Sequence, residues 1–229
     1  MKKVFLILLA ISLLLCAQSV LSESSKAIFG GLSVGGVISF GHFEQDGNED
    51  NGPEEIEWIV LNMDGEYATL ISKYVLDAKA FNDERITVTW ESCTLRQWLN
   101  NGFFNKAFTE TEQALIRKVI VTADKNLQNS TAEPGNDTLD QVYLLSVSEA
   151  RRWFTSDKDR VAYPTDVAAS NGARYWVDEE SVFWWLRTPG SNSDWASAVG
   201  SQGKIDRTGT NVDKERGGVR PVITIRFSE

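Results

Sequence analysis

Histidine and cysteine are scarce in this sequence, and their scarcity excludes several kinds of chemistry. Of 229 residues, one is histidine and two are cysteine. Zinc sites and hydrolytic triads use histidine together with partner side chains, so the single His42 is expected to be structural or exposed. No glycine-rich segment has a spacing that binds phosphate. The sequence therefore offers no catalytic residue, no metal site and no cofactor site that we would propose.

Cys93 is the only cysteine beyond residue 16, so a chain that loses its leader cannot form an intrachain disulfide. Its fold must then be stabilised by burial. Cys93 precedes a predicted helix, whose N-terminus would favour a thiolate. Because the sequence supplies neither a second cysteine nor a neighbouring histidine, we interpret Cys93 as a small buried thiol.

Basic runs and long apolar runs are also missing. The chain has 23 lysines and arginines against 32 acidic residues, a net charge of −9. An acidic surface without a basic patch argues against nucleic acid and anionic lipid as partners. No apolar run reaches the ~20 residues that a spanning helix needs, so we expect no transmembrane segment in the mature chain.

The first 22 residues have the three-part plan of a secretory signal peptide. Residues 1–3 are positively charged, residues 4–16 are almost wholly apolar, and residues 17–22 are small or polar. We expect cleavage after Ser22, with Ser19 as the alternative. The protein is therefore expected to be secreted or held in the cell envelope, extracellular or periplasmic.

Cleavage after residue 22 leaves 207 of the 229 residues and, because Lys2 and Lys3 are lost, lowers the net charge from −9 to −11. Cys16 suggests a lipid anchor, but Leu15 stands where lipoprotein signals need a small residue, which favours plain secretion. In the mature chain, residues 23–36 are expected to be a flexible lead-in and residues 37–229 one globular domain.

Residues 44–57 contain seven acidic residues and no basic one, which predicts an exposed loop. Four side chains fall at positions 1, 3, 5 and 12 of a calcium-loop pattern: Asp46, Asn48, Asp50 and Glu57. Asn51 stands where that pattern needs glycine, and the loop runs into a strand rather than a helix. We therefore predict no metal here.

Apolar alternation predicts strands at residues 37–43, 56–63, 67–72, 119–121, 142–145, 182–186, 196–199, 204–206 and 219–227. Helices are predicted at residues 94–101 and 165–171, and after the capping boxes Thr109/Glu112 and Ser146/Glu149. Residues 126–140 are nearly devoid of apolar side chains and are expected to be a surface loop. Strands at both ends with helices between them indicate an α+β fold with mostly antiparallel sheets.

Five segments occur in a fixed order: IEWIVL at 56–61, LRQWLN at 95–100, YLLS at 143–146, FWWLRTPG at 183–190 and GGVRPV at 217–222. With these segments the chain resembles the bacterial domain-of-unknown-function family 6273 over residues 38–227. The pattern is more distantly similar to C-type-lectin-like domains, which include the formylglycine-generating enzymes and the variable proteins of diversity-generating retroelements.

In those relatives, loops between a late tryptophan-rich segment and a terminal Gly-aliphatic-Arg segment form a ligand face. The resemblance therefore implies a C-type-lectin-like fold of mostly antiparallel sheets with short helices. Formylglycine generation uses a pair of cysteines, whereas the mature chain has only Cys93, which argues against that activity.

Two arginines, Arg187 and Arg220, stand inside apolar segments. A buried guanidinium is costly unless carbonyls or a carboxylate accept its hydrogen bonds. We therefore predict a buried structural network, with direct ligand contact as the alternative. Trp184 and Trp185 are adjacent and on a strand would point to opposite faces, so at least one should lie in the core.

The predicted ligand face consists of the segments 191–195 and 207–216, which flank the two arginine-bearing strands. Its candidate ligand-binding residues are Asn192, Asp194, Trp195, Arg207, Asn211 and Asp213. One flat ring among several hydrogen-bonding groups suits oriented contact with a sugar or polar peptide. The alternative is an ordinary solvated loop, since polar tips are common on any β surface.

Three functions from different classes are compatible with these features. The first is a secreted, non-catalytic binding module for a glycan or an extracellular protein. The second is a structural or assembly component of the cell surface. The third is a hydrolase that uses only carboxylates, which would need a close, inward-facing pair of acidic side chains.

Overall fold

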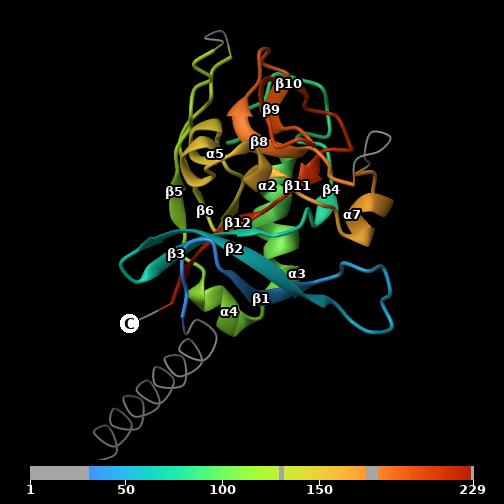
Figure 1. The fold of residues 1–229 in the computed structure, drawn as a ribbon. Helices are drawn as coiled ribbons and strands as arrows, with labels where there is room; N and C mark the ends of the chain where they lie inside the picture. The colour runs from blue at the N-terminus through green and yellow to red at the C-terminus, as the bar shows by residue number, and fades with distance from the viewer. Residues whose placement is uncertain (1–30, 129–131, 174–179, 228–229) are drawn as a thin grey trace, which may run out of the picture.

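The computed structural model describes residues 31–128, 132–173 and 180–227. The fold is mixed α+β, and its two five-stranded sheets share one hydrophobic core (Figure 1). The predicted signal peptide, its cleavage site and Cys16 lie outside the described residues. None of the helices within the described ranges is long and apolar enough to cross a membrane.

The lower sheet has the order β1-β2-β3-β12-β7, with every neighbour antiparallel. Its strands are β1 (Val37–Phe43), β2 (Glu54–Asp64), β3 (Tyr67–Ser72), β12 (Val222–Arg226) and β7 (Val142–Tyr143). Gly65 joins β2 to β3 in a hairpin turn, with a φ of +58° that glycine adopts readily. Because β12 pairs with β3, strands from the two ends of the domain form one sheet.

The described part of the expected lead-in is already anchored to this sheet. The amide of Gly35 donates to the carbonyl of Val60 (2.8 Å), and the amide of Val60 donates to the carbonyl of Gly36 (2.9 Å). The chain is therefore held against β2 before β1 begins.

The upper sheet has the order β10-β9-β8-β11-β4. Its strands are β10 (Ile205–Asn211), β9 (Trp195–Val199), β8 (Trp184–Pro189), β11 (Gly218–Val219) and β4 (Asp77–Ala78). Only the pair β8–β11 is parallel among its described strands. β9 and β10 form a hairpin at the edge of this sheet, and three of the six predicted ligand-binding residues lie on it: Trp195, Arg207 and Asn211.

The prediction of one strand over residues 219–227 is wrong. The segment divides into β11, in the upper sheet, and β12, in the lower sheet, with Arg220 and Pro221 between them. Proline has no amide hydrogen to continue a strand ladder, and the carbonyl of Pro221 instead accepts from the amide of Ser72 (3.0 Å). The chain therefore crosses from one sheet to the other at Arg220.

A central helical run joins α2 (Thr94–Trp98), the π-turn η1 (Leu99–Phe103) and α3 (Phe104–Ala107). It extends beyond the predicted residue 101 because Phe103, Phe104 and Ala107 are buried and continue its apolar face. The other elements are α4 (Glu110–Leu115), β5 (Val119–Val121), β6 (Thr138–Asp140), α5 (Val147–Trp153), α6 (Asp157–Arg160) and α7 (Asp166–Ser170). Both predicted capping boxes are confirmed at the starts of α4 and α5.

The prediction that residues 126–140 form a surface loop is wrong at both ends of the segment. Asn126 is 2% exposed and Asp140 is fully buried, and β6 ends the segment. Polar side chains are stable in the interior when their hydrogen bonds are met. Asp140 accepts from Trp90 Nε1 (2.9 Å), Thr138 Oγ1 (2.6 Å) and Arg96 Nε (2.8 Å).

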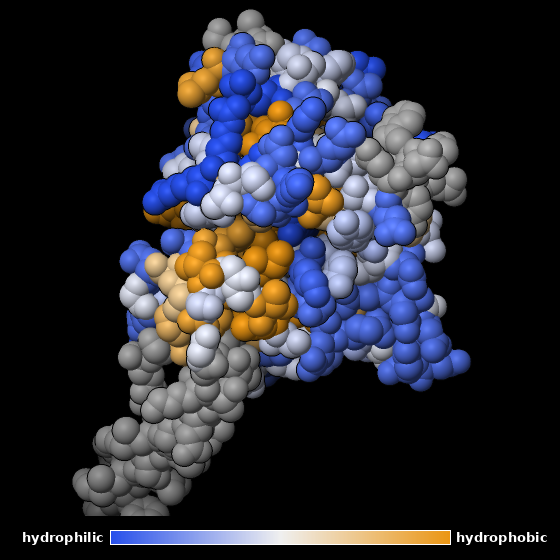
Figure 2. All heavy atoms as spheres, in the orientation of Figure 1, coloured by the Kyte–Doolittle hydropathy of each residue, from blue (hydrophilic) through white to orange (hydrophobic). Residues whose placement is uncertain are grey.

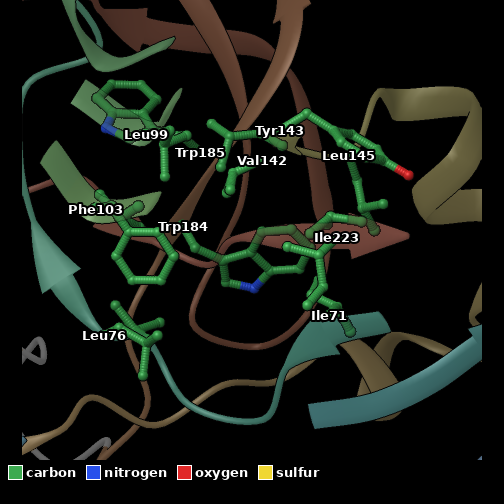
Figure 3. Packing of buried hydrophobic residues seen from close by; sticks show 14 of the residues in the cluster. Ile71, Leu76, Leu99, Phe103, Val142, Tyr143, Leu145, Trp184, Trp185 and Ile223 are labelled. Atoms are coloured by element: carbon green, nitrogen blue, oxygen red, sulfur yellow. The ribbon is translucent and has the colours of Figure 1, made fainter. Parts of the chain in front are cut away.

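The core lies between the two sheets and the central helical run. Trp184 and Trp185 of β8 are both fully buried. Figure 3 shows the Trp184 indole in the centre of the cluster, with Ile71 and Ile223 of the lower sheet on one side and Phe103 of the helical run on the other. The Trp185 indole donates to the carbonyl of Lys79 (2.9 Å). Each tryptophan thus gains apolar burial without leaving its N–H unpaired.

Candidate functional site

Arg220 is the most deeply buried of the arginines that the sequence singled out. Its guanidinium donates to three carbonyls, those of Ser72 (2.8 Å), Lys73 (3.4 Å) and Arg160 (3.5 Å), and its Cζ lies 5.1 Å from the Trp184 ring centroid. Burial lowers the pKa of Arg220 to about 9, which still leaves it charged at neutral pH. It therefore ties the sheet crossing to the end of β3, and its place is structural rather than ligand-facing.

The guanidinium of Arg187 donates hydrogen bonds to an acidic side chain as well as to backbone carbonyls. It donates to both carboxylate oxygens of Glu149, and also to the carbonyls of Leu144 (2.7 Å) and Thr122 (3.2 Å). Glu149 is at the same time the capping-box residue of α5 and accepts from the amide of Ser146 (2.9 Å). This two-point pair fixes α5 against β8.

Arg160 connects this interior network to the β9–β10 hairpin. Its Nε donates to the carbonyl of Gly203, in the hairpin turn, at 2.9 Å, and it pairs with Asp157. The carbonyl of Arg160 accepts from the Trp184 indole (3.0 Å). The turn between β9 and β10 is thereby held rigidly against α6.

The two predicted ligand segments do lie together, but much of the second is strand rather than loop. Trp195, the first residue of β9, pairs in register with Asn211, the last residue of β10. Arg207 also lies within β10. The amide of Val212 donates to the carbonyl of Asp194 (3.0 Å), which closes the open end of the hairpin.

Internal contacts already engage part of this face. Asp194 forms an ion pair with Arg85 (2.8 Å), whereas Asn192 is exposed and Asp213 is partly exposed. Trp195 and Asn211 are both partly buried, and Trp195 Nε1 and Asn211 Oδ1 are buried with no hydrogen-bond partner among the described residues. In this conformation neither of these two atoms is accessible to a ligand.

A cavity of about 540 Å³ lies along one side of the hairpin. Its lining includes one aromatic ring and side chains that donate or accept hydrogen bonds: Phe183, Asp206, Thr210, Lys214 and Arg216. Asp206 Oδ1 accepts from the amides of Thr208 (2.9 Å) and Gly209 (3.1 Å), which orients the carboxylate. Phe183 packs edge-on against Trp185, with ring centroids 5.6 Å apart.

The sequence singled out none of the five side chains just named. Thr210, Lys214 and Arg216 fall within the segment 207–216 that was predicted as a ligand loop, but they were not among its candidate ligand-binding residues. Phe183 belongs to the FWWLRTPG segment, which indicated core packing. Of the six predicted residues, Arg207 alone lines one of the two cavities beside the hairpin, and that cavity lies on the other side from Asp206.

A third cavity, of about 630 Å³, adjoins β4 and α2, and two of its polar lining residues, Lys79 and Asn171, are held by Asp77. Lys79 lies 3.3 Å from Asp77 and 4.7 Å from the Trp98 ring centroid. Asn171 Nδ2 donates to Asp77 Oδ1 (2.8 Å). Lys79 and Asn171 are therefore already engaged by Asp77.

The remaining candidates from the sequence are dispersed. His42 is exposed on β1. Cys93 is fully buried at the N-terminus of α2, where its sulfur accepts from the amide of Arg96 (3.4 Å). Burial raises the pKa of Cys93 to about 12, so the thiol is protonated and unreactive at neutral pH.

The four residues of the calcium-loop pattern do not converge, because Glu57 lies on β2 and pairs with Lys73 (3.0 Å). A different trio, Glu44, Asp46 and Glu54, has carboxylate oxygens within 4.8 Å of one another. Those oxygens already bind the loop: Glu54 Oε2 accepts from the amides of Gln45 (2.7 Å) and Asp46 (3.3 Å). The trio therefore stabilises the turn.

Comparison with known proteins bears on family rather than on function. Neither a curated protein nor a solved structure matches the chain. A family model described as "Domain of unknown function (DUF6273)" matches residues 65–227, which covers the region from β3 to the end of β12 and includes four of the five ordered segments. The chain therefore belongs to the domain-of-unknown-function family DUF6273.

Proposed function

We propose that this protein is an exported, non-catalytic binding module whose ligand is a glycan. The observation that carries the proposal is the cavity beside the β9–β10 hairpin, whose volume of about 540 Å³ suits a small ligand or a few sugar units. It lies on a hairpin whose turn is pinned by Arg160, so the site is held in shape before a ligand arrives.

The side chains of this cavity match the chemistry of a sugar. A sugar presents an apolar ring face and several hydroxyls, each of which both donates and accepts hydrogen bonds. Phe183 supplies an aromatic surface, Asp206 accepts, and Lys214 and Arg216 donate. Such a mixture favours a polar ligand, bound in one orientation, over an apolar ligand.

The proposal includes the sequence-predicted residues at the open end of the hairpin. Asn192 is exposed there, and Asp213 is partly exposed, so both are accessible to a longer ligand that extends beyond the cavity. It also includes a C-type-lectin-like architecture, supported by the order of the sequence segments and by the position of this face late in the chain.

The direct experiment is a binding screen of the mature chain, from residue 23 onward, against a panel of bacterial and host oligosaccharides, followed by calorimetry on the best neutral ligand. Arg216→Ala is expected to weaken that ligand at least about tenfold. Lys204→Ala is the matched control, because Lys204 is an exposed cation on the same hairpin outside the cavity lining.

A panel without a ligand, or equal losses in the two variants, contradicts the glycan proposal. A protein captured in place of a glycan, with Arg216 required, favours the alternative of an extracellular protein ligand.

Export is tested separately. The intact mass of the secreted protein is expected to correspond to a chain that begins at Glu23. A mature protein that begins at a lipid-modified Cys16 contradicts plain secretion.

A further inference from the structure

The opposite side of the hairpin carries a second cavity, of about 530 Å³, with a different character. Arg207 of β10 lines it, together with Arg151 and Arg152 from the end of α5. Adjacent residues of a strand point to opposite faces, so Asp206 and Arg207 serve different cavities. Figure 1 shows α5 between the upper sheet and the arm that leads up from β5.

The three guanidinium groups of this cavity have no hydrogen-bonding or ion-pair partner among the described residues. Five other described arginines pair with acids: Arg85 with Asp194, Arg96 with Asp140, Arg160 with Asp157, Arg187 with Glu149 and Arg226 with Glu66. On a chain with a net charge of −9, three unpaired arginines around one cavity are a local concentration of positive charge.

The cavity remains positive after its acidic groups are counted. Lys125, which also lines the cavity, pairs with Glu133 (3.0 Å), so these two charges cancel. The negative charge of Asp124 offsets one of the three arginine charges, which leaves a net charge of +2. Burial alone would raise the pKa of Asp124, but hydrogen bonds from Ser146, Ser148 and Thr122, together with the charge of Arg187, lower that pKa, so this carboxylate is counted as charged.

Asn126 holds the cavity in a fixed shape. Its Nδ2 donates to the carbonyls of Pro189 (3.0 Å), Gly190 (3.3 Å) and Arg207 (2.8 Å), which joins the segment after β5 to β8 and β10. At one edge Leu127 is 92% exposed and offers an apolar surface. The arginines thus stand around a preformed concave surface.

We propose that Arg151, Arg152 and Arg207 form a binding site for the acidic groups of a glycan, that is, for a carboxylate, sulfate or phosphate on a sugar. The planar guanidinium fork binds such oxyanions through two hydrogen bonds at once. The carbohydrate part of this inference rests on the proposed function. With it, the two sides of one hairpin recognise two features of the ligand, its hydroxyls and its charge.

The test uses a galacturonic acid tetrasaccharide and the same tetrasaccharide fully methyl-esterified, in which an uncharged methyl ester replaces each carboxylate. Calorimetry on the mature chain is expected to show at least about tenfold tighter binding of the acid, weakening as salt is added. A sulfated dextran oligosaccharide and inorganic phosphate identify which oxyanion is preferred.

The double variant Arg151→Ala/Arg152→Ala and the single variant Arg207→Ala are each expected to lose this preference for the acid. Lys118→Ala/Lys158→Ala is the matched control, because it removes two exposed positive charges outside the cavity. Thermal unfolding shows that each variant is folded.

Equal binding of acid and ester, unchanged binding in the arginine variants, or no binding of any of the three anions overturns the site. If a neutral glycan binds normally to the arginine variants while no anion binds, the proposed function stands and this inference fails. If the anion binds through the arginines while no neutral glycan binds, the inference of an oxyanion site stands and the first cavity loses its role.

Discussion

Arg187 and Arg220 lie in the interior between the two sheets, whereas Arg151, Arg152 and Arg207 surround a surface cavity. The interior pair uses its donors on carbonyls and on Glu149. The surface group has no such partners among the residues that the structure describes. An arginine side chain therefore stabilises the fold where protein groups accept its hydrogen bonds, and it is a candidate for ligand binding where they do not.

Figure 2 shows a related contrast on one face of the molecule. Apolar atoms gather over the lower sheet, whereas the surface of the upper part is mainly hydrophilic. Val34 (62%) and Val37 (48%) are exposed just before and at the start of β1, and Leu127 (92%), at the edge of the second cavity, is an exception to this contrast. The hydrophilic end is the one that carries the hairpin and its two cavities.

The largest expected effect is that of Arg220→Ala on stability. It leaves three carbonyls without this donor and removes the cation beside Trp184, and we expect a loss of about 4 kcal/mol in the free energy of unfolding. For a domain of this size the Tm should fall by roughly 10 °C. Circular dichroism melting measures it, with Arg226→Ala as an exposed control worth ~1 kcal/mol or less. An unchanged Tm would show that the crossing does not depend on Arg220.

A smaller loss is expected for Glu149→Gln, which keeps the capping geometry but removes the charge opposite Arg187. We expect a loss of about 2 to 3 kcal/mol, since a buried cation loses its counter-charge. Glu112→Gln is the matched control: Glu112 is the capping-box residue of α4 and has no arginine partner. Equal effects in urea unfolding would mean that capping, not the ion pair, explains the role of Glu149.

Asn126→Ala should lower the free energy of unfolding by a still smaller amount, about 1 to 2 kcal/mol, because three carbonyls lose the side-chain amide that donates to them. It should also speed hydrogen exchange at the Pro189–Gly190 end of β8. Asn101→Ala, at an exposed helical position, is the control. Unchanged exchange and stability would contradict the view that Asn126 fixes the second cavity.

The sequence predicted the structural arginines better than the ligand face, and the reason is physical. Arg187 and Arg220 stand in apolar segments, and an arginine there must be satisfied internally, which is a local argument. Arg151 and Arg207 come together only through the packing of α5 against β10, and no spacing in the sequence encodes that contact. Strand boundaries near Pro221 were mispredicted because apolar character alone does not show that the chain changes sheets.

The smallest effect on stability is expected for the surface arginines. Arg207→Ala and Arg151→Ala/Arg152→Ala should each change the free energy of unfolding by about 0.5 kcal/mol or less, since these side chains have no described partner to lose. Thermal melting beside the Arg220 variant measures the contrast directly. A destabilisation comparable to that of Arg220→Ala would place these arginines in the structural group.

The most direct measurement is a titration of the isotope-labelled chain from residue 23 onward with the best neutral oligosaccharide, followed by backbone amide NMR. The account predicts shifts at Phe183 and at the amides of Gly209, Thr210, Lys214 and Arg216, which line the cavity beside the hairpin. The backbone amide signals of Glu55 and Glu57 on β2, in the other sheet, should not shift. Shifts confined to the lower sheet, or no shifts at saturating ligand, would contradict a glycan-binding face on the β9–β10 hairpin.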